Sequence, residues 1–169
     1  MRDKNIILIG FMGVGKGTIA RAIVAQSDYF AIDTDDLIES LENTKIKKIF
    51  AKEGEPYFRD LEKKCALWCE KNLQGTIIST GGGFYRQENI HKIGTVIYLK
   101  ASFESIIKRL ENAPNSKAKF KKRPLLQDLD KAKDIYNQRV KEYESVADIV
   151  IDVDDFDAQK AVKNILKAI

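Results

Sequence analysis

A glycine-rich turn between a buried strand and a helix constrains this fold more than any other feature of the sequence. The apolar run Ile6–Ile9 has the composition of a strand buried on both faces. It leads directly into Gly10–Thr18 (GFMGVGKGT), and a helix is expected over residues 16–26. Such glycines let successive main-chain N–H groups point inward, and the helix N-terminus adds partial positive charge. The segment therefore predicts a cradle for phosphate oxygens, with Lys16 able to reach the β and γ phosphates of a nucleotide.

The turn departs from the usual phosphate-loop pattern at one position. That pattern has Ser or Thr after the lysine, where the hydroxyl contacts magnesium, but here Gly17 follows Lys16 and Thr18 comes one residue later. Nucleotide binding survives this change, because the cradle is made of main-chain groups. Mg²⁺ keeps several waters when it binds phosphates. We therefore expect the ion to be held through water by Asp33, with Thr18 or Ser79 assisting.

The rest of the chain alternates between expected strands and helices. Further strands are expected at 30–33, 76–79, 96–99 and 147–153. Helices are expected at 16–26, 46–53, 55–72, 103–110 and 130–145, and a final helix should bury Ala158, Ala161, Val162 and Ile165. This order predicts a three-layer α/β/α fold with a five-stranded parallel sheet, whose ligands bind beyond the carboxyl ends of the strands.

Length and composition predict one cytoplasmic domain. The chain has 169 residues, with no internal repeat and no linker rich in proline, glycine or serine. No apolar run could span a bilayer, and the apolar stretch near the start is too short for a signal peptide. Cys65 and Cys69 are expected to be buried as small apolar residues, and His91 to be structural. We expect a monomer that binds neither membranes nor nucleic acid.

Positive charge gathers in the stretch 111–124, which lacks an apolar period and is expected to be a mobile loop. Its basic residues lie within seven positions, and they are Lys117, Lys119, Lys121, Lys122 and Arg123. A solvated surface, a nucleic-acid contact and an anionic small ligand would all use such charge. Aromatic interleaving and zinc-ligand spacing are absent from the sequence, so the small anion is favoured over nucleic acid.

The second expected strand ends in an acidic segment, Asp33-Thr34-Asp35-Asp36. We assign Asp33 to the magnesium shell, and we expect Asp35 to accept hydrogen bonds from an acceptor hydroxyl and orient it for attack. Asp36 is expected to serve only the N-terminus of a helix over 35–41. Neither an Asn-Lys-x-Asp nor an Asp-x-x-Gly motif of switch GTPases is present. These features favour a small-molecule kinase.

The ordered motifs resemble those of the shikimate kinase family over essentially the whole chain. They are Gly10–Thr18, Asp33-Thr34-Asp35, Phe58-Arg59-x-x-Glu62, Gly81-Gly82-Gly83, Arg123-Pro124-Leu125 and Arg139-x-x-x-Tyr143. The resemblance implies a P-loop NTPase fold of the nucleoside monophosphate kinase type. It also implies one kinase domain over 1–169, with an acceptor-binding segment at about 34–62 and a lid at about 111–124. The implied reaction transfers the γ-phosphoryl group of ATP, with Mg²⁺, to the 3-hydroxyl of shikimate.

Residue by residue, the resemblance implies two sets of contacts. Shikimate would be held by Asp35, Arg59, Gly82 and Arg139, with Glu62 orienting Arg59. ATP would be bound by Gly13, Val14, Gly15, Lys16, Gly17, Thr18, Arg109 and Arg123. The catalytic residues would be Lys16, Asp35 and Arg123, with Arg109 stacking on adenine. The acidic stretch 152–156 departs from the basic residues that family members often carry near adenine, so this contact stays unassigned.

Helical phase supports the two carboxylate-binding arginines unequally. Arg139 shares a helical face with apolar residues such as Ala132 and Tyr143, and a charge in an apolar stripe requires a partner. Arg59 lies opposite the expected apolar face of Leu61, Cys65 and Trp68, so phase alone predicts an exposed side chain. The resemblance, which implies that this side of the helix faces a cleft, is the reason to place Arg59 in the site.

Three alternatives stay open at this point. The sequence Gly15–Thr18 is similar to the loop of adenylate kinases, although the Asp-Gly-Phe-Pro-Arg element of that family is missing. A gluconate-type kinase is a second alternative, disfavoured by the Asp33/Asp35 pair and the triple glycine. A non-catalytic nucleotide-sensing module is the third, with Gly17 as a sign of lost activity.

Overall fold

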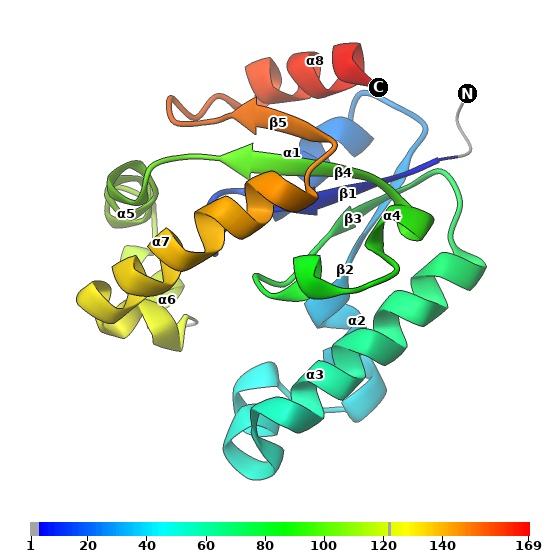
Figure 1. The fold of residues 1–169 in the computed structure, drawn as a ribbon. Helices are drawn as coiled ribbons and strands as arrows, with labels where there is room; N and C mark the ends of the chain where they lie inside the picture. The colour runs from blue at the N-terminus through cyan, green and yellow to red at the C-terminus, as the bar shows by residue number, and fades with distance from the viewer. Residues whose placement is uncertain (1–3, 122) are drawn as a thin grey trace.

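A parallel sheet of five strands forms the centre of the structure (Figure 1). The structure is a computed structural model that describes residues 4–121 and 123–169, so Lys122 of the basic stretch lies outside the described residues. The strands follow the order β2-β3-β1-β4-β5 and are β1 Asn5–Ile9, β2 Phe30–Asp33, β3 Thr76–Ser79, β4 Gly94–Lys100 and β5 Ile149–Asp152. All neighbouring pairs are parallel, so the five carboxyl ends share one edge, as predicted.

Helices cover both faces of the sheet and give the three predicted layers. On one face α1 packs on β1 and β3 and against α8, whereas α7 packs on β4 and α3 packs against α4 on the other. The helices are α1 Lys16–Val24, α2 Thr34–Glu42, α3 Ile46–Asn72, α4 Ile90–Ile93, α5 Phe103–Glu111, α6 Ser116–Lys121, α7 Leu129–Val146 and α8 Ala158–Ala168. Two 3-10 turns, η1 Phe84–Arg86 and η2 Pro124–Gln127, complete the order.

The core is built around β1, which is the middle strand of the sheet. All five of its residues are buried, in agreement with a strand covered on both faces. Full burial of one isoleucine or leucine side chain contributes about 1.5–3 kcal/mol. β1, buried and paired on both sides with β3 and β4, therefore positions the glycine turn that follows it at the carboxyl edge of the sheet.

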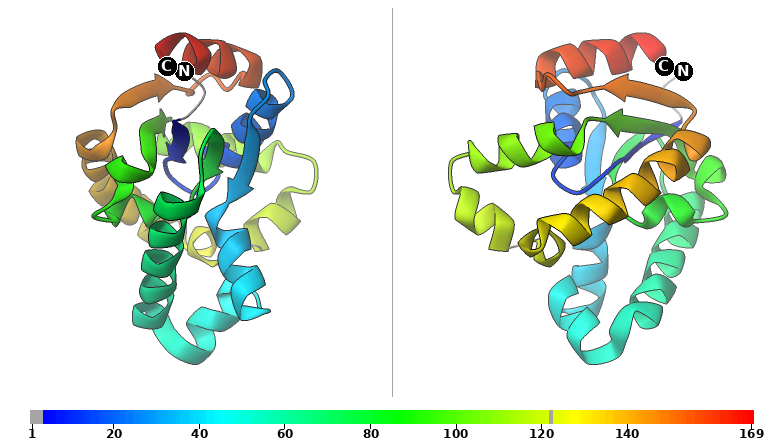
Figure 2. Two further views of the ribbon diagram at one scale, coloured as in Figure 1. Left: turned by 90° about the vertical axis from the view of Figure 1, so that its right-hand side faces the viewer. Right: turned by 60° about the vertical axis from the view of Figure 1, so that its left-hand side comes forward.

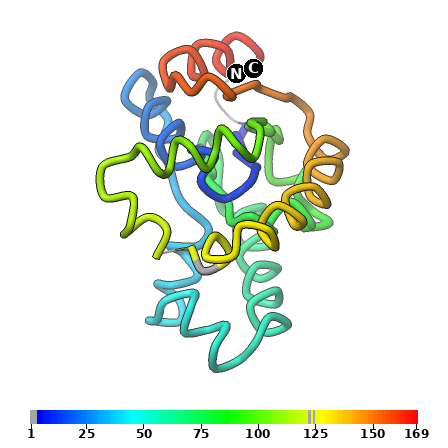
Figure 3. The backbone as a smooth tube through the Cα atoms, turned by 90° about the vertical axis from the view of Figure 1, so that its left-hand side faces the viewer, coloured from blue at the N-terminus to red at the C-terminus, as the bar shows by residue number. Residues whose placement is uncertain are grey.

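Two segments extend from the sheet at its carboxyl edge (Figures 2 and 3). One consists of α2 and the first half of α3, and the other of α5 and α6. The predicted helix break at Gly54 is confirmed, because this residue has φ +83° and interrupts α3 with a kink. The kink lets the chain turn back toward the sheet, and the second half of α3 then packs against α4.

Three expectations about local structure were wrong. The stretch 111–124 is not all loop, since it contains α6, whose half-buried Phe120 packs against the main core. Trp68 is 46% exposed and does not belong to a buried face of α3. In α8 the side chains of Ala161, Val162 and Ile165 are buried as expected, but Ala158 is only half-buried.

Of the two cysteines, Cys69 is buried and Cys65 half-buried, and both are free thiols. Within the described part of the chain, no helix combines the length and the apolar character that crossing a membrane requires.

Candidate active site

The phosphate loop leaves β1 at the carboxyl edge of the sheet and continues into α1. Gly10 and Gly15 have φ angles of +144° and +106°, which side-chain-bearing residues rarely adopt. A Cβ on Gly10 would lie 2.8 Å from the carbonyl oxygen of Leu99, and one on Gly15 would lie 2.6 Å from the ring of Phe156. Both glycines are thus required by conformation and by packing. A loop of this shape forms a main-chain nest that suits phosphate oxygens.

Gly17, by contrast, is not required by the fold. It lies in the first turn of α1 with ordinary helical geometry, and a Cβ there would meet Nη1 of Arg21 at 3.5 Å, an ordinary contact distance. Thr18 is exposed at the surface of the cleft. The absence of a hydroxyl at position 17 therefore has no steric cause.

Lys16 is buried beneath the loop that precedes it. Its Nζ donates hydrogen bonds to the carbonyl oxygens of Gly10, at 2.7 Å, and Phe11, at 3.2 Å. Burial lowers the pKa of this amine to about 8, although the nearby carboxylates of Asp33 and Asp35 oppose the change. The amine is therefore mostly protonated at neutral pH and held where a phosphate would lie.

Asp33 ends β2 and caps α2. Its Oδ1 accepts a hydrogen bond from the N–H of Asp35 at 2.9 Å, which satisfies one of the free donors of the helix. Its Oδ2 accepts a hydrogen bond from Oγ of Ser79 at 2.7 Å, across the paired strand ends. Asp36 lies exposed in the first turn of α2, the position expected for it.

The donor set around Asp33 fits magnesium held through water. Each Asp33 oxygen already accepts one hydrogen bond but keeps a second lone pair, which can bind a metal-bound water. Within the described residues, no group of three or more His, Cys, Asp or Glu side chains could hold a metal ion. The residues thus suit an ion whose remaining ligands are waters and phosphates.

Asp35 lines the cleft, and one of its carboxylate oxygens is buried against Gly81. Among the described residues, its buried Oδ1 has no hydrogen-bond partner. Burial raises the pKa of this carboxyl to about 7, and repulsion from Asp33 and Glu62 adds to the effect. A buried acceptor without a partner is costly unless a ligand supplies the donor. Asp35 is therefore equipped to receive a hydroxyl proton near neutral pH.

The triple glycine after β3 brings three charged side chains against one turn. A Cβ on Gly81 would lie 2.6 Å from Oδ1 of Asp35, and one on Gly82 would lie 3.2 Å from Nη1 of Arg139. A Cβ on Gly83 would overlap with Nη1 of Arg59. The three glycines are thus explained by close approach, because any side chain would displace the charged groups that converge there.

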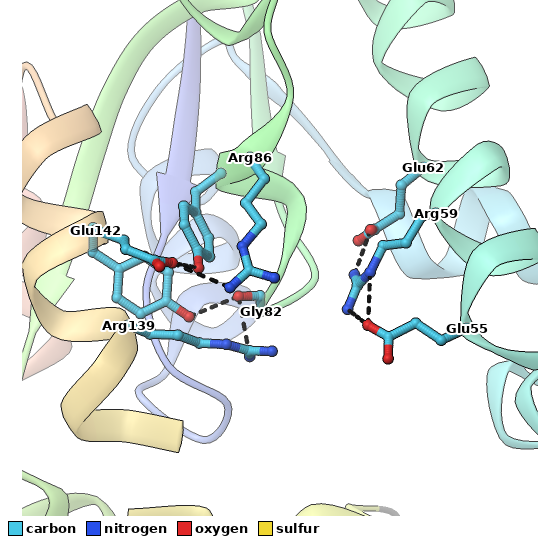
Figure 4. A network of polar contacts seen from close by, with 9 residues as sticks. Glu55, Arg59, Glu62, Gly82, Arg86, Arg139 and Glu142 are labelled. Carbon is cyan, nitrogen blue, oxygen red and sulfur yellow. Dashed lines mark hydrogen bonds and ion pairs between the residues drawn. The ribbon is translucent and has the colours of Figure 1, made fainter. Parts of the chain in front are cut away.

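Arg59 and Arg139 face each other across the gap between α3 and α7 (Figure 4). Arg139 donates a hydrogen bond to the carbonyl oxygen of Gly82 at 3.3 Å, and the hydroxyl of Tyr143 donates to the same oxygen at 2.7 Å. Arg59 is half-buried and lines the cleft, so the exposure that helical phase predicts was wrong, while its role in binding the acceptor stays a prediction. Its Nη1 donates to the buried carboxylate of Glu62 at 2.6 Å, which is the predicted pair.

Arg109 and Arg123 approach the phosphate loop from the α5–α6 segment. Arg109 donates from Nη2 to the carbonyl oxygen of Gly13 at 2.9 Å, and its guanidinium lies 4.2 Å from the ring centroid of Phe156. Arg123 donates to the carbonyl oxygen of Lys119 at 2.8 Å. Phe156 lies in the acidic stretch that the sequence left unassigned, so this segment contributes an aromatic ring instead of basic residues.

A single cleft of about 2150 Å³ joins all of these groups. Every residue predicted for the site lines it except Val14, whose side chain is buried in the core, so only its main chain is available. Pockets for one small ligand usually measure about 300–1,000 Å³. The cleft can therefore hold two ligands, one at the phosphate loop and one between the two arginines.

Among the cleft residues that sequence reasoning missed, Glu55 and Phe156 contact predicted site residues. Glu55 binds the outer edge of the Arg59 guanidinium, and Phe156 packs beneath Gly15. The spacing of Glu55 and Arg59 at i, i+4 was a signal, but such pairs are common on exposed helices. Nothing in the acidic composition around Phe156 indicated its contact with the loop.

Comparison with known proteins agrees with this geometry. A family model described as shikimate kinase matches residues 12–169. A shikimate kinase from Helicobacter hepaticus is 40% identical over 89% of this chain and 87% of its own length. One from Sulfurihydrogenibium is 37% identical, with 98% of each chain covered. The structure described as shikimate kinase from Acinetobacter baumannii in complex with shikimate has a TM-score of 0.85 at 30% identity, covering 98% of this chain and 92% of that one. The chain belongs to the shikimate kinase family.

Proposed function

We propose that this chain transfers the γ-phosphoryl group of ATP to the 3-hydroxyl of shikimate, giving 3-phosphoshikimate and ADP. One observation carries the proposal. The carboxylate of Asp35 lines the same cleft as the phosphate loop with Lys16 and the opposed guanidinium groups of Arg59 and Arg139 (Figure 4). A small acid with several hydroxyls has the groups that such a cleft can bind.

On the nucleotide side, main-chain N–H groups of residues 13–18 would bind the phosphates. Lys16 would leave its two carbonyl partners and contact the β and γ phosphates, whose added charge also raises the pKa of its amine. Arg123 would stabilise the charge on the transferring group, and Arg109 would stack on the adenine. Most of the rate would come from placement and electrostatics, because phosphoryl transfer needs little covalent help from the protein.

On the acceptor side, a guanidinium fork suits the shikimate carboxylate, since parallel N–H donors meet both oxygens. Arg59 and Arg139 would share this carboxylate, and the glycine turn at Gly82 would let the ring approach the main chain. Asp35 would accept a hydrogen bond from the reacting hydroxyl and orient it in line with the phosphate. Its pKa of about 7 suits the transfer of a proton near neutral pH.

Magnesium would neutralise charge on the β and γ phosphates when bound. Asp33 would hold it through water, with Ser79 fixing the orientation of the carboxylate by the hydrogen bond at 2.7 Å. Gly17 provides no hydroxyl, and the exposed Thr18 is the nearest replacement in the chain. Magnesium bound to this chain would therefore depend more on water and phosphate ligands than magnesium bound to a phosphate loop with Ser at position 17.

We further propose one kinase domain over residues 1–169, which acts as a monomer in the cytoplasm. The segment at about 34–62 would bind the acceptor, and the segment at about 111–124 would close over ATP as a lid. Both segments extend from the carboxyl edge of the sheet (Figures 2 and 3), and residues of both line the cleft. Closure would exclude water and limit the hydrolysis of ATP.

The test is an assay of ADP release with shikimate, AMP and gluconate supplied as separate acceptors. We expect turnover with shikimate alone, and turnover only with AMP, or with none of the three, would contradict the proposal. The variant Arg139→Ala should abolish shikimate binding and leave the affinity for ATP within a few-fold. If both affinities disappeared together, Arg139 would have a structural role instead.

A further inference from the structure

Two carboxylates of its own helix bind the guanidinium of Arg59 and use three of its five N–H donors (Figure 4). Its Nη1 donates to Oε2 of Glu62 at 2.6 Å. Its opposite edge, made of Nε and Nη2, donates twice to Oε1 of Glu55, at 3.1 and 2.7 Å. That edge, with two N–H groups pointing the same way, is one of the two edges of a guanidinium that can bind a carboxylate as a fork.

The two carboxylates differ sharply in burial. The side chain of Glu62 is 1% exposed, whereas that of Glu55 is 60% exposed. Removing Glu62 from Arg59 would leave a buried charge without its partner, which is strongly unfavourable. Glu55 can move into water at little cost, because ion pairs of exposed side chains contribute only about 0.2–1 kcal/mol.

Glu55 also lies close enough to Arg59 and Arg139 for the charges of both guanidinium groups to act on it. Arg59 is the largest cause that lowers the pKa of the Glu55 carboxyl, and Arg139 on the opposite wall lowers this pKa as well. Arg139 itself contacts the main chain at Gly82 from Nη1 only. Both guanidinium groups thus act on Glu55 in the way they would act on the carboxylate of a bound acid.

We propose that Glu55 is a stand-in anion, which occupies the Nε–Nη2 fork of Arg59 in the empty enzyme and must be displaced before the carboxylate of the incoming acid can take this fork. The identity of that acid as shikimate rests on the proposed function. Glu55 thereby weakens binding of the acid, because the apparent affinity falls with the fraction of sites in which the fork is free. It also shields the guanidinium pair from other small anions, since each must compete with an internal carboxylate.

The opposite role for Glu55 would be to hold Arg59 in its binding position. The structure assigns that task to Glu62, which forms the shorter and buried ion pair with the other edge of the guanidinium. Loss of Glu55 should therefore leave Arg59 in place and free its fork. For an exposed ion pair, removing the competition should tighten binding of the acid by about 1.4–5-fold.

The experiment compares Glu55→Gln and Glu55→Ala with Glu53→Gln as the matched control. Glu53 lies on the same helix, pairs with Lys52 at 2.9 Å and is outside the cleft. Calorimetry would give the dissociation constant of shikimate and of its neutral carboxamide for each variant. The KM values for shikimate and ATP would come from the ADP-release assay, and melting curves would confirm that each variant is folded.

We expect both Glu55 variants to bind shikimate about 1.4–5-fold more tightly than the wild type, with no gain for the carboxamide and none for Glu53→Gln. Unchanged or weaker binding of shikimate, or an equal gain for the carboxamide, would overturn the role of Glu55. A wild type that binds shikimate without turnover would overturn the proposed function alone, since the ratio of dissociation constants still decides the role of Glu55.

Discussion

Replacing Asp35 by asparagine should remove activity and at the same time stabilise the folded protein. The carboxyl of Asp35 has its pKa raised from 3.8 to about 7, first by burial and then by repulsion from Asp33 and Glu62. A carboxyl with a raised pKa holds its proton more tightly in the folded state than in the unfolded state. Stability is therefore lost as the pH rises from about 4 through 7, where the folded protein must carry the charge. Asparagine has no charge to carry.

The size of the effect follows from the same pKa. At about 1.4 kcal/mol per pKa unit, a change from 3.8 to about 7 corresponds to an upper bound of about 4 kcal/mol above pH 7. Asp35 is half-buried as a whole residue and Lys16 attracts its charge, so solvent and this attraction reduce the gain. We expect Asp35→Asn to be about 2 kcal/mol more stable at pH 8, or about 4–8 °C in Tm for a domain of this size.

Urea unfolding followed by circular dichroism, at pH 5 and at pH 8, measures the gain. The matched control is Asp36→Asn, the same change one residue along the same helical turn, where the side chain is exposed. The control should remain within about 1 kcal/mol of the wild type at both pH values. Activity of Asp35→Asn should fall by about 10²-fold or more. A variant that is less stable than the wild type at pH 8, or equally stabilised at both pH values, would refute the reasoning.

Three further predictions concern the pH dependence and the glycines. The kcat/KM for shikimate should rise through pH 7, as Asp35 with its pKa of about 7 loses its proton, whereas the kcat/KM for ATP should fall above pH 8, as Lys16 of the nucleotide-free enzyme with its pKa of about 8 loses its own; flat profiles between pH 6 and 9 would contradict both assignments. Gly83→Ala should push the guanidinium of Arg59 aside and raise the KM for shikimate by about 10-fold or more, with the KM for ATP little changed; a normal KM for shikimate would show that the turn yields instead. Gly17→Ser should raise stability by about 0.5 kcal/mol, because the helix has room for the side chain, and should lower the magnesium concentration at half-maximal activity; an unchanged magnesium titration would place the ion away from position 17.

Much of the fold was predictable because the strongest signals are local. A four-residue apolar run followed by glycines indicates a buried strand and a turn without any knowledge of the partners. The short helix α6 gave no such signal. It has six residues, and its half-buried Phe120 is the residue that packs against the main core. A single apolar side chain cannot establish a period, so the segment looked like a loop.

The triple glycine shows a second limit of prediction from sequence. From the sequence, Gly81–Gly83 indicates only a flexible turn. The reason for each glycine is a charged side chain that arrives from another element, namely Asp35 from α2, Arg59 from α3 and Arg139 from α7. These contacts join residues that are far apart in the chain, so no local pattern could reveal them.

The helical phase of α3 failed because a functional charge lies on its buried face. The side chains that α3 buries beyond its kink are Phe58, Leu61, Glu62, Ala66 and Cys69, so the predicted Leu61 is buried but Glu62 shares the buried face. If every carboxylate is assumed to be exposed, Glu62 is left out of the buried face of α3. The predicted apolar face then shifts around the helix and includes Trp68. Glu62 is tolerated there because Arg59 neutralises it at 2.6 Å. Glu62, which orients the Arg59 guanidinium, is thus also the residue that interrupts the apolar pattern of the buried face of α3. The pattern fails at a position where the site needs a buried charge.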